Sequence, residues 1–199
     1  RVAAVAAAEE LGDPELTARV IGAYDVPAIW TRLDDPQQAA SIVAASERTL
    51  AALAADFGAD PGAPGQDAIR ARLLATIAVE SRGGRSERGR WAARQAEEIA
   101  RRLDDPGLLA FALNGVFMQS FERAGLAPRR DATGAELIAL AARHGLVAFE
   151  VLGHLIRLQA RGALGDFAAA DRHAAAAERL GERHERPLVG VFTAVSHTH

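Results

Sequence analysis

Cysteine and lysine are missing from this chain of 199 residues, and aromatic residues make up only 5% of it. Without cysteine, neither disulfide bonds nor thiolate metal sites can form, which fits a cytoplasmic protein. No apolar run approaches the roughly 20 residues that a membrane-spanning helix needs, and no signal peptide is recognisable. The formal net charge of -3 gives no electrostatic footprint for nucleic acid. We therefore expect a cytoplasmic protein that makes no membrane contact.

Alanine dominates what is present, and 49% of the residues are hydrophobic. Alanine is the best helix former, and its small side chain lets helices approach closely. Valine and isoleucine recur at helical spacing and never gather into the alternating runs of a strand. The chain begins at Arg1 without a methionine, in a stretch typical of mid-helix. The sequence thus predicts an all-α protein: one helical-repeat domain over residues 1–199, as part of a larger protein.

A short phrase marks the boundaries between helices. It reads Leu-x-Asp-Pro and recurs at residues 11–14, 33–36 and 103–106. The aspartate can accept hydrogen bonds from the free N–H groups of the next helix, and proline suits the first helical position. These signals predict helices over 2–11, 14–24, 36–57, 66–80, 88–103, 107–121, 131–144, 147–163, 167–183 and from about 187. Breaks are expected at 58–66, 81–90 and 122–133.

The helices predicted at 66, 107 and 147 start roughly 40 residues apart, a period typical of solenoids built from helical hairpins. The stretch from Gly165 to Phe167, followed by Ala170 and Ala177, matches part of the tetratricopeptide consensus. His154 and Arg161 depart from that consensus, which has Trp and Tyr there. The predicted architecture is a right-handed superhelix of antiparallel helix pairs.

The helix predicted over 147–163 carries a polar stripe on an otherwise apolar surface, formed by Glu150, His154, Arg157 and Arg161 at helical spacing. In a solenoid, the first helix of each pair lines the concave surface where partners bind. Corresponding positions on the two preceding repeats extend the stripe. The predicted ligand or partner groove comprises Thr76, Glu80, Asn114, Met118, Phe121, Glu150, His154 and Arg157. The alternative is that Glu150 and Arg157 form inter-helix ion pairs and that His154 fills a core position.

Catalytic and metal-binding patterns are weak. Glu150 and His154 share a helical face, but a metal site needs a further ligand, and no second pair stands at matching positions. The glycine-rich stretch 81–90 lacks the lysine and the preceding strand of a phosphate-binding loop. No Gly-x-Ser-x-Gly elbow occurs. We expect a protein that is not an enzyme and that binds no cofactor or metal.

Four segments together resemble a known family: residues 70–80, 100–114, 144–147 and 153–157. They look like the C-terminal tetratricopeptide-like region of large actinobacterial transcriptional activators of the antibiotic regulatory protein (SARP) type. The resemblance covers about 70–193. In that family a winged helix-turn-helix binds DNA, a bacterial transcriptional activation domain follows, and the helical repeats sense a signal or hold partners.

The resemblance implies a sensor or protein-interaction domain of a transcriptional regulator, with a protein or small-molecule effector as its partner. DNA would be contacted only through domains that this chain does not contain. The alternative is a ligand-free oligomerisation scaffold, in which a homodimer forms through a terminal helix beginning near Pro187.

Overall fold

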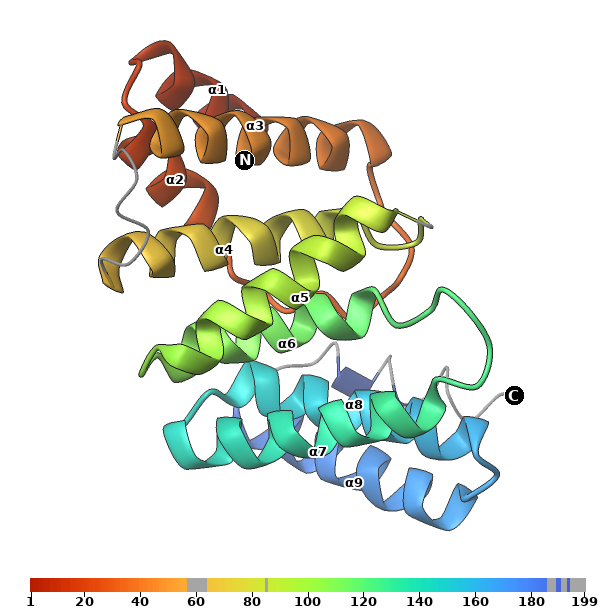
Figure 1. The fold of residues 1–199 in the computed structure, drawn as a ribbon. Helices are drawn as coiled ribbons and strands as arrows, with labels where there is room; N and C mark the ends of the chain where they lie inside the picture. The colour runs from red at the N-terminus through yellow and green to blue at the C-terminus, as the bar shows by residue number, and fades with distance from the viewer. Residues whose placement is uncertain (57–63, 85, 186–188, 191–192, 194–199) are drawn as a thin grey trace. The chain divides into compact units, whose positions relative to one another are not determined.

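The computed structural model describes residues 1–56, 64–84, 86–185, 189–190 and 193. Within these ranges the chain forms nine α-helices and no strand, so the all-α prediction is confirmed. The helices are α1 Val2–Glu10, α2 Pro14–Gly22, α3 Pro36–Asp56, α4 Pro64–Glu80, α5 Glu87–Arg102, α6 Pro106–Met118, α7 Ala127–His144, α8 Val147–Ala163 and α9 Phe167–Arg183 (Figure 1).

The aspartates of the recurring phrase cap helices as predicted. The Asp13 carboxylate accepts a hydrogen bond from the Leu16 amide at 2.9 Å, and Asp105 accepts one from the Leu108 amide at 2.9 Å. In both cases proline occupies the first turn of the helix that follows. Each cap satisfies an N–H group that has no partner inside its helix. The local sequence therefore determines where these helices begin.

Two boundaries differ from the prediction by three residues or more, and the others by at most two. Helix α7 begins at Ala127 rather than at 131, because Pro128 stands in its first turn, where a missing N–H costs nothing. Helix α6 ends at Met118 rather than at 121. Most of the expected break at 58–66 and most of the helix expected from about 187 lie outside the described residues.

The chain divides into two compact units, where the sequence analysis expects one domain. Unit 1 is Arg1–Gln119 and unit 2 is Ser120–His199. In unit 1, helix α4 contacts α2, α3, α5 and α6, and its Leu73, Leu74 and Ile77 are almost completely buried. In unit 2, α8 contacts both α7 and α9. Consecutive helices run antiparallel from α4 to α6 and from α7 to α9 (Figure 1).

Helices α7 and α8 cross with their backbones in contact. A Cβ atom added at Gly153 would lie 2.7 Å from Cγ1 of Ile138 and 3.0 Å from the carbonyl oxygen of Gly134. One added at Gly134 would lie 3.0 Å from the carbonyl oxygen of Gly153. A side chain at either position would force the helices apart, since carbon and oxygen atoms do not approach that closely without strain. Glycine at both positions thus sets the separation of the two helices.

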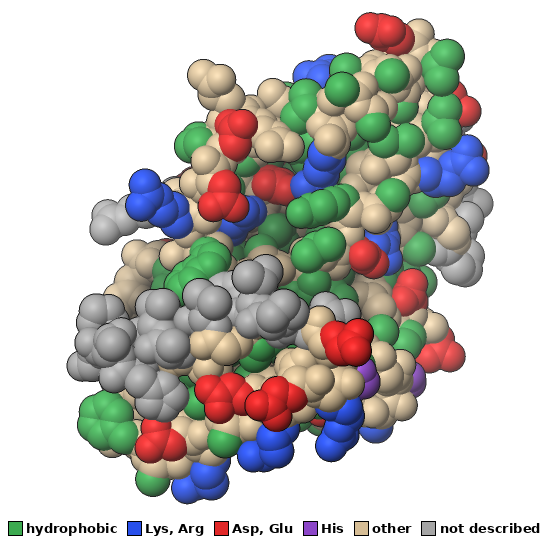
Figure 2. Space-filling view, turned by 180° about the vertical axis from the view of Figure 1, so that it is seen from behind, with side chains coloured by type: hydrophobic (Ala, Val, Ile, Leu, Met, Phe, Trp, Pro, Cys, Tyr) green, Lys and Arg blue, Asp and Glu red, His purple; other side chains and the backbone are tan. Residues whose placement is uncertain are grey.

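Charged side chains of both signs are scattered among apolar and other polar side chains on the face of the molecule shown in Figure 2. Acidic and basic groups are interspersed over the face shown in Figure 2, with neither sign forming a broad continuous area. Among the helices that the structure describes, none combines the length and the hydropathy that crossing a bilayer requires.

Candidate functional site

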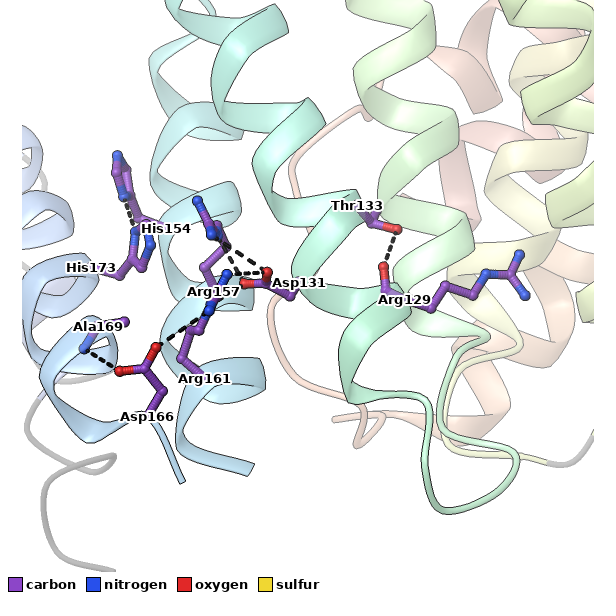
Figure 3. Close-up of polar contacts among 9 residues, drawn as sticks. All are labelled: Arg129, Asp131, Thr133, His154, Arg157, Arg161, Asp166, Ala169 and His173. Carbon is purple, nitrogen blue, oxygen red and sulfur yellow. Dashed lines mark hydrogen bonds and ion pairs between the residues drawn. The ribbon is translucent and has the colours of Figure 1, made fainter. Parts of the chain in front are cut away.

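The polar stripe of α8 is joined to α7 by a carboxylate that the sequence analysis did not select. Asp131 on α7 accepts hydrogen bonds from Arg157 Nε at 2.9 Å and from Arg161 Nη2 at 2.6 Å (Figure 3). Arg161 Nε adds a third contact to Asp131 at 2.8 Å, and Arg161 Nη1 reaches Asp166, the N-cap of α9, at 3.3 Å. Forked hydrogen bonds of this kind are strong and directional. Asp131 therefore organises both arginines.

The charges in this cluster reinforce one another. Burial by itself raises the pKa of Asp131, but the hydrogen bonds and positive charges of Arg157 and Arg161 outweigh burial and lower it. The hydrogen bond from Arg161 to Asp131 raises the pKa of Arg161 in turn. Asp131 and Arg161 are therefore both ionised at neutral pH. The sequence analysis offered, as an alternative to a binding groove, that Arg157 forms an ion pair between helices. Arg157 does form such a pair, and its acidic partner is Asp131 on α7.

A pair of histidines joins α8 to α9. The Nδ1 atoms of His154 and His173 lie 2.9 Å apart (Figure 3), so one ring carries its proton on Nδ1 and donates it to the other. Burial, together with the charges of His173, Arg157 and Arg179, lowers the pKa of His154 to about 4. Burial also lowers the pKa of His173. Both rings are therefore neutral at pH 7.

We call the side chains that join the three helices of unit 2 the polar seam: Asp131, Arg157, Arg161, His154 and His173. Asp131, Arg157 and Arg161 join α7 to α8, and the histidine pair joins α8 to α9. The two histidines are only two potential metal ligands, and the part of the chain that the structure describes holds no group of three or more His, Asp or Glu able to bind a metal ion. Because the charged groups already hold one another, the seam sets the register of three helices.

Three of the predicted groove residues are buried in unit 1. Thr76, Asn114 and Met118 have relative exposures of 1%, 0% and 2%. Asn114 Oδ1 accepts a hydrogen bond from the Ala28 amide at 2.8 Å, and Asn114 Nδ2 donates one to the Ala28 carbonyl at 2.8 Å. Asn114 thus anchors the non-helical segment 23–35 onto α6. In this structure these three side chains contribute to packing rather than to an exposed surface.

The other predicted residues are more accessible. Phe121 is 39% exposed and lies under the guanidinium of Arg130, 4.6 Å from the centre of its ring. Glu150 is half-buried on α8. The eight predicted residues are divided between the units, with Thr76, Glu80, Asn114 and Met118 in unit 1 and the rest in unit 2. A single groove lined by all eight stays a prediction.

Glu80 lines an open cleft in unit 1. The cleft has a volume of about 810 Å³ and lies between the first half of α3, the segment 31–34 and the turn that joins α4 to α5. Its apolar wall is formed by Leu33, Pro36, Ala39, Ala40, Val43 and Ala44. We call this site the α3 cleft.

Charged groups gather at the end of the α3 cleft formed by the α4–α5 turn. The Glu80 carboxylate is paired with Arg1 through one oxygen and with Arg82 Nη1 at 3.4 Å through the other. Arg82 Nη1 also donates to the Val79 carbonyl at 3.0 Å. The turn lies directly against segment 31–34, because a Cβ at Gly83, whose φ is +78°, would be 2.5 Å from the Thr31 carbonyl oxygen. Only glycine fits there.

Comparison of the chain with models of protein families, with curated proteins and with solved structures finds no match.

Sequence reasoning missed two features of these sites. Asp131 carries no pattern of its own, since its partners lie 26 and 30 residues further along the chain. The mid-helix glycines Gly134 and Gly153 could have indicated that α7 and α8 pack closely, which is what brings Asp131 to its partners. Glycine inside a helix is costly unless a close approach requires it. The α3 cleft had no local signal, since it combines residues 31–44 with the α4–α5 turn, which lies much further along the chain.

Proposed function

We propose that this chain is the sensor or protein-interaction region of a cytoplasmic transcriptional regulator, and that its helix pairs belong to a right-handed, tetratricopeptide-like superhelix. The resemblance of residues 70–193 to the repeat region of antibiotic regulatory proteins supports the proposal. So does the partial tetratricopeptide match around Gly165. DNA is contacted through domains that this chain does not contain.

The α3 cleft is the observation that carries the binding role. Small-molecule sites are concave, largely apolar, and hold a few polar groups that orient the ligand. The α3 cleft has this composition, with an apolar wall on α3 and the Glu80–Arg82 pair at one end. Glu80 is also one of the residues that the sequence analysis selected for effector binding.

The contacts around the cleft provide a route for a signal. Segment 31–34 forms one wall, and the same non-helical stretch is anchored to α6 by the two hydrogen bonds between Ala28 and Asn114. An effector that contacts α3 and segment 31–34 together favours one arrangement of this stretch. A ligand shifts a conformational equilibrium only through such a difference in affinity between two states.

A pair of substitutions on α3 tests this function. Ala40 is exposed and lines the cleft, whereas Ala51 is exposed on the same helix and does not line it. Ala40→Trp fills the cleft without disturbing the core, and Ala51→Trp is the matched control. With each change placed in the chromosomal gene, Ala40→Trp alters the transcript levels of a set of genes and Ala51→Trp does not. Equal transcript profiles for the two variants and the wild type would refute the sensor role.

An oligomerisation scaffold is the second candidate, and one observation favours it. Leu164 and Phe167, which flank the α8–α9 turn in unit 2, are 48% and 68% exposed. Large apolar side chains at a surface are typical of contact sites when they cluster. On this account the chain dimerises in sedimentation experiments and Phe167→Glu makes it monomeric. A monomeric wild-type chain would exclude this candidate.

A further inference from the structure

The apolar wall of the α3 cleft favours a molecule with an apolar body. Pro36, Ala40, Val43 and Ala44 present only small hydrocarbon side chains along this part of α3, and small side chains leave the cleft open. The volume of about 810 Å³ lies within the range of roughly 300–1,000 Å³ that is typical of small-molecule sites. The wall by itself selects no charge, so the charged end of the cleft determines the class of ligand.

The charged end has its acceptors more fully engaged than its donors. Arg32 and Arg82 line the cleft together with Asp34 and Glu80, so the lining itself is balanced in charge. Arg1, which does not line the cleft, pairs with one oxygen of Glu80, and Arg82 contacts the other. Arg32 is exposed. Glu80 is already held by two arginines.

Arg82 also has unused hydrogen-bonding capacity. Its Nε is buried and has no hydrogen-bond partner among the described residues, although Nη1 contacts both Glu80 and the Val79 carbonyl. A buried donor without a partner is unfavourable. A small rotation of the guanidinium toward an anion in the cleft would give this donor a partner. Guanidinium groups bind carboxylates through two parallel hydrogen bonds, which suits an anionic group at this end.

We propose that the α3 cleft binds a small amphiphilic carboxylate, with its hydrocarbon body along α3 and its carboxylate at Arg32 and Arg82. This inference rests on the proposed function, because it names the ligand of the same cleft. A cationic amphiphile would place its charge against Arg32 and Arg82. A neutral one would offer no charged partner to Arg32 and Arg82.

The test compares three molecules with the same ten-carbon body and different head groups: decanoate, decanol and decylamine. Binding to the full chain is measured by isothermal titration calorimetry below the critical micelle concentration of each. The expected result is that decanoate binds about tenfold more tightly than decanol, and decylamine more weakly still, since one charge-assisted contact separates the first two.

Four variants locate the binding site. Arg32→Gln weakens decanoate binding severalfold and leaves decanol binding unchanged, while Arg19→Gln, an exposed arginine on α2 outside the cleft, changes neither. Ala40→Trp weakens all binding, and Ala51→Trp weakens none. Circular dichroism of each variant confirms that it has folded.

The outcomes separate this inference from the proposed function. If the three amphiphiles bind equally well and Ala40→Trp weakens all of them, the preference for a carboxylate is overturned and the cleft remains a binding site. The same conclusion holds if Arg32→Gln has no effect on decanoate. If Ala40→Trp changes no binding at all, or if none of the three molecules binds, the cleft is not a site for amphiphiles and the inference is overturned together with its basis.

Discussion

The close crossing of α7 and α8 predicts that Gly153→Ala destabilises unit 2. In an exposed helix this substitution stabilises, because alanine is favoured over glycine by about 1 kcal/mol. At Gly153 the added methyl group would lie 2.7 Å from Ile138 Cγ1 and 3.0 Å from two backbone atoms, Gly134 O and Ile138 N. Backbone atoms cannot rotate away, so the helices must separate.

The magnitude follows from two opposing effects. Overpacking by one methyl group costs about 1–3 kcal/mol, and the gain in helix propensity offsets up to about 1 kcal/mol of that. Gly162 provides a control on the same helix, because nothing lies within 4 Å of a Cβ placed there. The difference between Gly153→Ala and Gly162→Ala cancels the propensity effect. We expect it to be about 1–3 kcal/mol, with Gly162→Ala as the more stable variant.

Urea unfolding followed by circular dichroism measures this difference. The wild type and both variants are compared at pH 7, and amide hydrogen exchange in α7 and α8 reports whether the loss is confined to unit 2. If Gly153→Ala proves as stable as Gly162→Ala, the backbones of α7 and α8 do not cross as closely as described. The register that places Asp131 against Arg157 would then need another explanation.

Three further predictions concern the polar contacts. Asn114→Ala removes both hydrogen bonds to Ala28, so we expect the free energy of unfolding to fall by about 2 kcal/mol. The Ala28 amide should also exchange its hydrogen faster, and an unchanged exchange rate would show that Asn114 does not hold segment 23–35 in place. His154 has a pKa lowered from 6.5 to about 4 in the folded chain, so protons bind the unfolded chain more readily and stability falls as pH drops from about 6.5 to about 4. In His154→Gln this part of the pH dependence of the melting temperature is lost, and a profile identical to that of the wild type would argue against the buried contact with His173. Asp131 has a lowered pKa, so its stabilising effect is complete above the unfolded value of about 3.9 and disappears as pH falls through the folded value. Asp131→Asn is therefore less stable than the wild type at pH 7, and the two stabilities converge in acid; a gap that persists at low pH would show that packing, not charge, is lost.

Helix positions were largely predictable because their determinants are local. Asp13 and Asp105 each accept a hydrogen bond from the amide three residues ahead, and the proline that follows each suits the first turn of the helix. A window of a few residues therefore contains the whole signal. The start of α7 was misplaced because Leu126, its N-cap residue, makes no side-chain capping hydrogen bond. Where the cap is weak, packing of the helix decides the boundary.

The candidate sites were only partly predictable. The spacing of His154, Arg157 and Arg161 correctly places them along one face of α8, but it does not reveal that Asp131 holds the two arginines. Asn114 was selected as a polar residue on an apolar helix, and such a residue suits either a ligand or a buried backbone contact. The structure shows the backbone contact, with Ala28, 86 residues away in the chain.

The sequence by itself determined the helical class and most of the helix boundaries, because alanine content, apolar spacing and caps act within a few residues. It also determined which polar side chains share a helix face. Tertiary structure alone decided which of those faces meet a partner: it brought Asp131 to Arg157, His154 to His173, and segment 31–34 to the α4–α5 turn beside the α3 cleft. These contacts depend on how closely the helices cross. Glycines such as Gly134 and Gly153 permit a close crossing, but no local pattern specifies which two helices will meet there.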